Sequence, residues 1–77
     1  MVPALKVRIG GITILHITTF QEASQFLEEW DTGARNAFYY LAADALAGFD
    51  EGIVPPEVAR LAFETFCREV GILSVQP

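Results

Sequence analysis

The sequence predicts an α+β fold in which an N-terminal β-hairpin packs against three α-helices. Apolar and polar residues alternate over residues 4–9, with the period of a half-buried strand. A Gly-Gly pair follows, and from Phe20 to Val70 apolar residues recur at every third or fourth position, as in helices with one buried face. Because 77 residues are too few for a second core, we assign residues 1–77 to a single domain.

The hairpin is predicted from its alternation and its turn. Apolar residues at the odd positions predict a first strand over about residues 4–9. Gly10-Gly11 favours a two-residue turn, and a second strand follows over about residues 12–18. The second strand is apolar on both faces, and the pattern leaves open which face is buried. One face carries Ile12, Ile14 and His16, and the other carries Thr13, Leu15 and Ile17.

The first helix is predicted over about residues 20–30. Thr19 and Glu22 form a capping box, in which each side chain accepts a backbone N–H that the helix start leaves unpaired. The second helix is predicted over about residues 34–47, with Asp31 or Thr32 as its N-cap and Gly48 as its stop signal. Its predicted buried stripe consists of Ala34, Ala37, Phe38, Leu41, Ala42, Ala45 and Phe49.

The third helix is predicted over about residues 56–70. Proline in the first turn and Glu57 beside it suit a helix start, and Gly71 suits its C-terminal cap. Residues 72–75 are mostly apolar and suit a short third strand beside the hairpin. The predicted buried stripe consists of Val58, Ala59, Ala62, Phe63, Phe66, Cys67 and Val70.

Charge and composition exclude several classes of function. Five basic and ten acidic residues give a formal net charge of −5, which argues against nucleic-acid binding, because that affinity comes from clustered Lys and Arg. The N-terminal residues do not resemble a signal peptide, and no stretch approaches the roughly 18 to 20 apolar residues that span a bilayer. We expect a soluble, cytoplasmic protein that binds neither nucleic acid nor membrane.

Asp31-Thr32-Gly33-Ala34 matches the short signature of aspartic proteases, in which two chains each supply one aspartate. Those enzymes are all-β, whereas this tetrapeptide follows a predicted helix, so a cap between two helices is the favoured interpretation. A small hydrolase or ligand-binding domain that uses Asp31 is the alternative.

No other residues form a catalytic or metal-binding set. His16 is the only histidine and has no nucleophile and orienting carboxylate in the pattern that covalent catalysis needs. Cys67, the only cysteine, cannot form an intramolecular disulfide and lies on a predicted buried stripe, where a thiol is unreactive. Two acidic clusters, Glu28, Glu29 and Asp31 and the pair at 50–51, lack the spacing of a calcium loop. We therefore predict no catalytic residue, no cofactor, no metal and no enzymatic activity.

A protein-interaction or regulatory module that self-associates, as a homodimer for instance, is the favoured function. The second strand has two apolar faces, and a sheet this small cannot cover both with one layer of helices. Two tyrosines of the second predicted helix add to the candidates, because tyrosine is favoured at interfaces. The candidate contact residues are Leu15, Ile17, Tyr39 and Tyr40. An acidic surface that binds a basic protein partner is a further alternative.

Short motifs along most of the chain resemble a family of small bacterial proteins catalogued as domain of unknown function 982. The motifs are Glu22-Ala23, Phe26-Leu27 and Trp30, then Ala45-Leu46-Ala47-Gly48, Ala59-Arg60-Leu61-Ala62-Phe63 and Glu69-Val70-Gly71-Ile72. The likeness departs after Trp30, where that family usually has proline and a longer connection. The resemblance implies a compact α+β module, and it implies no catalytic residue.

Overall fold

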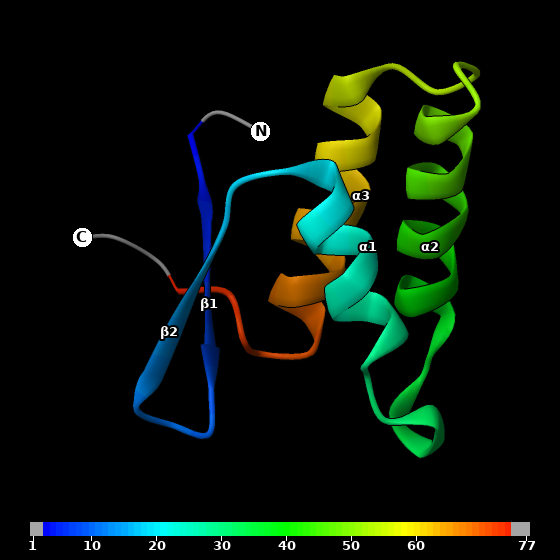
Figure 1. The fold of residues 1–77 in the computed structure, drawn as a ribbon. Helices are drawn as coiled ribbons and strands as arrows, with labels where there is room; N and C mark the ends of the chain where they lie inside the picture. Colours follow the sequence, from blue (N-terminus) through cyan, green and yellow to red (C-terminus); the bar gives the residue numbers. More distant parts are fainter. Residues whose placement is uncertain (1–2, 75–77) are drawn as a thin grey trace.

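The computed structural model describes residues 3–74, and it confirms the predicted α+β fold. A β-hairpin precedes the helices, which lie together on one side of it (Figure 1). In chain order the elements are β1 (Leu5–Ile9), β2 (Thr13–Ile17), α1 (Phe20–Glu28), the 3₁₀ helix η1 (Thr32–Ala34), α2 (Ala37–Asp50) and α3 (Pro56–Glu69). No helix within residues 3–74 is both long and apolar enough to cross a membrane.

The two strands pair antiparallel, with Leu5 opposite Ile17 and Ile9 opposite Thr13. This register leaves residues 10–12 as a three-residue connection, so the predicted two-residue turn is wrong, and the second strand begins at Thr13, one residue later than predicted. Both glycines adopt positive φ, 65° and 85°, which reverses the chain, but one further residue is needed before pairing resumes.

The C-terminal segment 72–74 runs beside β1 on the edge opposite β2. The Arg8 N–H donates to the Ile72 carbonyl at 2.7 Å, and the Ser74 N–H donates to the Lys6 carbonyl at 2.9 Å. These bonds flank one bridge between Val7 and Leu73, and no third strand is formed within residues 3–74. The predicted strand over 72–75 is thus reduced to one bridge, and its last residue lies outside the described range.

The capping box predicted for α1 is present: the Thr19 hydroxyl accepts the Glu22 N–H at 3.0 Å, and the Glu22 carboxylate accepts the Thr19 N–H at 3.2 Å. The predicted cap of α2 is wrong. Asn36 caps α2 by accepting the Tyr39 N–H at 3.0 Å, whereas Asp31 caps η1. An extra turn of 3₁₀ helix therefore separates α1 from α2, and α2 begins three residues later than predicted.

Gly48 lies inside α2 and does not end it. A Cβ atom at this position would collide with Cγ2 of Val54, so Gly48 permits the loop after α2 to fold back against the helix. The chain turns instead at Gly52, which has a φ of 78° and follows the helix end. The predicted stop signal is thus wrong, and a close approach explains the glycine.

The predicted buried stripe of α2 is also out of register. Its buried residues are Tyr39, Ala42 and Leu46, whereas Leu41 is 61% exposed. Phe38 lies at the surface as well. In α3 the prediction is better: Ala59, Phe63, Phe66 and Cys67 are buried, and Val58 is the exposed exception.

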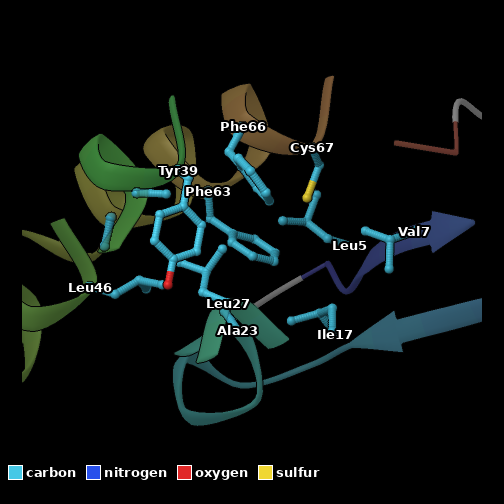
Figure 2. Packing of buried hydrophobic residues seen from close by; sticks show 12 residues of the cluster. Leu5, Val7, Ile17, Ala23, Leu27, Tyr39, Leu46, Phe63, Phe66 and Cys67 are labelled. Atoms are coloured by element: carbon cyan, nitrogen blue, oxygen red, sulfur yellow. The ribbon is translucent and has the colours of Figure 1, made fainter. Parts of the chain in front are cut away.

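The core lies between the hairpin and the helices, and aromatic rings from α3 form its centre (Figure 2). Phe63 and Phe66 are fully buried. Phe66 makes edge-to-face contacts with Trp30 and Tyr39, at centroid distances of 5.3 and 5.9 Å. Leu5, Val7 and Ile17 close the core from the sheet, next to Cys67 (Figure 2). The hairpin is thus anchored at the end where Leu5 pairs with Ile17.

Candidate functional site

The hairpin has one covered edge and one open edge. The backbone groups of Lys6 and Arg8 bond to residues 72–74, and backbone groups alternate sides along a strand, so the intervening residues of β1 bond to β2. In β2 the residues opposite them, at 13, 15 and 17, therefore bond back to β1. The N–H and C=O groups of Ile14 and His16 point away from β1, to a side where no residue of 3–74 pairs with them.

Side chains along β2 change from buried to exposed toward the turn. Ile17 is buried against the helices, whereas Leu15 on the same face is 38% exposed. Ile14 on the opposite face is 39% exposed, and Ile12 in the turn is 91% exposed. The turn end of the hairpin lies away from the helices (Figure 1), and its apolar residues lack cover for that reason. We call residues 12–16 the open edge.

A small groove of about 170 Å³ lies between β2 and α1, next to the open edge. Its apolar lining comes from Leu15, Ile17 and Phe26. Glu22 and Glu29 lie at its α1 side, so the groove combines an apolar floor with negative charge. An extended, apolar segment laid against β2 would contact this groove.

Hydrogen bonds fix Glu22 where β2 leads into α1. Its Oε1 accepts the Thr18 hydroxyl at 2.7 Å and the Thr18 N–H at 2.8 Å. The bond from the Thr18 hydroxyl, followed by those from the two backbone N–H groups, lowers the pKa of Glu22 below its ordinary value. The carboxylate is therefore charged at neutral pH. The Thr18 N–H, just beyond the open edge, is thus engaged by Glu22.

The model of one protein family, described as "Protein of unknown function (DUF982)", matches residues 4–74. The chain belongs to the DUF982 family. This match covers both strands and all three helices, and it confirms the resemblance seen in the sequence. A search of curated proteins and a search of solved structures each found no match.

Of the four candidate contact residues, the DUF982 chain exposes two and buries two. Tyr40 is 55% exposed, and Leu15 is part of the open edge. Ile17 and Tyr39 are buried, so for these two the expectation of a surface contact is corrected. The Arg35 guanidinium lies 4.7 Å above the Tyr39 ring and donates to the carbonyls of Glu28 and Trp30. The sequence did not reveal this burial because it depends on the shifted register of α2.

A larger groove, of about 720 Å³, runs between α1 and α2 of the DUF982 chain. Leu27 and Leu46 contribute apolar lining, and Phe20 stacks on Phe49 at a centroid distance of 4.3 Å beside it. The volume lies within the range of small-molecule sites, roughly 300 to 1,000 Å³. No sequence motif indicated this groove, because it forms only where two helices distant in the sequence come together.

The residues considered for chemistry are separate from one another. Asp31 is exposed, and its Oδ1 accepts the Gly33 N–H at 3.2 Å, as a cap does. Cys67 is fully buried, and burial, with a smaller contribution from the charge of Glu64, raises the pKa of its thiol to about 12. His16 is exposed on β2. Within residues 3–74, no three His, Cys, Asp or Glu side chains gather closely enough to hold a metal ion.

Proposed function

We propose that this DUF982 chain is a protein-interaction module that self-associates through the open edge of its sheet. The observation that carries the proposal is an apolar strand, β2, with one side unpaired. An unpaired strand edge is a template for pairing with another chain, and proteins that must avoid such pairing place Lys, Pro or a bulge on the edge. The strand Thr13–Ile17 contains no Lys, Arg, Asp, Glu or Pro.

The opposite edge of the sheet supports this interpretation by contrast. There the segment 72–74 bonds to the Arg8 N–H and to the Lys6 carbonyl. The basic side chains of the hairpin also belong to β1. Their charge, together with the backbone pairing, disfavours pairing of that edge with another chain. The chain thus covers one edge itself and leaves the other for a partner. A regulatory role and a cytoplasmic location stay predictions from the sequence.

Size-exclusion chromatography with light scattering tests the proposal. We expect a dimer mass that falls toward the monomer mass on dilution, because the interface is small. Ile14→Lys places a charge on the open edge, so this variant should have the mass of a monomer at concentrations where the wild type is a dimer. Leu41→Lys is the matched control, since Leu41 is an exposed apolar residue of α2. A strict monomer at hundreds of micromolar would contradict self-association.

Ligand binding is the second candidate, and the groove between α1 and α2 is the observation that favours it. Asp31, the residue first considered for such a role, does not line this groove. Thermal-shift screening with small apolar amines tests the groove, whose polar lining includes Glu28 and Asp50. A ligand should stabilise the wild type and not Ser24→Phe, which fills the groove. Stabilisation of both proteins would place the ligand elsewhere.

A hydrolase that uses Asp31 can be tested with Asp31→Asn. Asparagine keeps an oxygen that accepts the Gly33 N–H, so the cap of η1 and the stability should change little. An acid or nucleophile at this position would be lost. A hydrolytic activity that disappears in this variant while the melting temperature holds would favour the enzyme over the interaction module.

A further inference from the structure

We infer that two copies of this chain pair β2 against β2, antiparallel, about a two-fold axis that passes beside Leu15. This inference rests on the proposed self-association and specifies its register. It follows from which backbone groups β2 presents, and from which of them are already engaged within the chain.

Only two residues of β2 present backbone groups on the open side, Ile14 and His16. In an antiparallel pair, two residues that face each other at a hydrogen-bonded position exchange both N–H···O bonds. With the axis at Leu15, Ile14 faces the partner's His16 and His16 faces the partner's Ile14. This register uses every presented group and yields four interchain hydrogen bonds.

The neighbouring registers either leave the Ile14 carbonyl unpaired or need a residue outside β2. An axis at His16 would set Ile14 opposite the partner's Thr18, whose N–H is engaged by Glu22. An axis at Ile14 would require pairing with Ile12, which lies in the turn and outside β2. The axis at Leu15 is therefore the register that pairs all four backbone groups of Ile14 and His16 without a residue outside β2.

Side chains fit the same register. Leu15 would face the partner's Leu15 at a non-hydrogen-bonded position, where side chains approach most closely, and the pair would cover surface that is now exposed. Ile14 would face the partner's His16, so no two charges of like sign lie directly opposite. A single two-fold axis thus gives both the backbone bonds and the apolar contact.

The axis sets the Ile17 end of one β2, which α1 accompanies, beside the partner's turn end, which the helices leave uncovered (Figure 1). The partner's hairpin then lies next to Glu22 and Glu29 at the small groove.

Cysteine cross-linking of the full chain tests the register. Opposed residues at a non-hydrogen-bonded position have Cα atoms about 4.5 Å apart, within the range of disulfides. We expect Leu15→Cys to form a covalent dimer under mild oxidation. Thr13→Cys should not, because two copies of residue 13 lie about 13 Å apart in this register at 3.3 Å per residue. The buried Cys67 gives little background.

A mixed experiment checks the same register at two exposed positions, where folding is not at risk. Ile14→Cys and His16→Cys, combined in equal amounts, should form heterodimers in excess of either homodimer, since these residues face each other across the axis. Homodimers in excess, or equal amounts of all three species, would overturn the register.

Leu61→Cys on the exposed side of α3 is the control for a helical interface. A light-scattering dimer whose Leu61→Cys variant cross-links while Leu15→Cys does not would overturn the β2 pairing and leave self-association intact. A light-scattering dimer with no cross-link at residues 14 to 16 would do the same. A monomer by light scattering, with no cross-link at any position, would reject both the inference and the proposed function.

Discussion

The two edges of this hairpin differ in backbone hydrogen bonding: within residues 3–74, the β1 edge bonds to another segment of the chain and the β2 edge does not. On the β1 edge, Gly71 turns the chain back after α3, and residues 72–74 form two backbone hydrogen bonds with the strand. On the β2 edge no segment of residues 3–74 pairs with the strand, so the outward backbone groups of Ile14 and His16 are unpaired there. The difference teaches that strand composition alone does not decide whether an edge is open, because a distant segment closes one of them.

The difference between the two edges depends on an intact core. Phe63→Ala should destabilise that core more than the other substitutions below. Phe63 is fully buried and packs edge-to-face on Phe26 at 6.0 Å. Truncation leaves a cavity and should lower the free energy of unfolding by about 3–5 kcal/mol. Urea denaturation followed by circular dichroism measures this loss.

The control for that prediction lies on the same helix. Leu61→Ala removes an exposed apolar side chain of α3 and should change the free energy of unfolding by only about 0.5 kcal/mol. Similar losses for the two variants would mean that α3 does not face the core as described.

Gly71→Ala should weaken the bonds between residues 72–74 and β1, so that the β1 edge becomes open like the β2 edge. Gly71 has a φ of 80°, and a Cβ there would meet nothing within 4 Å, so backbone strain alone opposes alanine. The cost is about 1–2 kcal/mol. Hydrogen exchange should speed up at the Ser74 N–H, which bonds to Lys6, while the amides between β1 and β2 keep their protection.

Gly33→Ala is matched to that change. Gly33 does not have positive φ, and its Cβ would lie 3.9 Å from the Asp31 carboxylate, so alanine is tolerated. We expect neither a change at Ser74 nor a loss beyond about 0.5 kcal/mol. Unchanged exchange at Ser74 in Gly71→Ala would show that the return of the chain does not need the glycine.

Local signals predicted the parts of the fold that local interactions determine. The Thr19 cap and the buried face of α3 were both visible in the sequence, because a cap and a 3.6-residue period involve neighbouring residues. The α2 register was missed. Phe38 and Leu41 fit an apolar stripe as well as Tyr39 does, and Asn36 competes with two earlier capping residues.

The site was predicted in part for the same reason. Alternation showed that β2 has apolar residues on both faces, and it placed Leu15 among the contact candidates. It gave no sign of which edge is open, because that depends on where residues 72–74 return. Nor did it show that Ile17 is buried, since the helices cover only one end of the strand. The groove between α1 and α2 likewise depends on long-range packing.

The smallest expected effect concerns the end of the open edge, where Glu22 holds the Thr18 N–H. The folded pKa of Glu22 is lowered, so its ionised form stabilises the fold above the ordinary pKa of glutamate. That contribution is lost as the pH falls through the lowered folded pKa. Glu22→Gln keeps an oxygen acceptor and removes the charge, so it should melt slightly lower than the wild type at neutral pH.

The difference in melting temperature between the wild type and Glu22→Gln should therefore shrink as the solution is acidified, because the wild-type carboxylate also becomes neutral. Glu29→Gln is the control, since Glu29 is an exposed acid of the same region whose carboxylate accepts no hydrogen bond within residues 3–74. Parallel melting of the wild type and Glu22→Gln throughout the acid range would show that the charge of Glu22 does not hold Thr18.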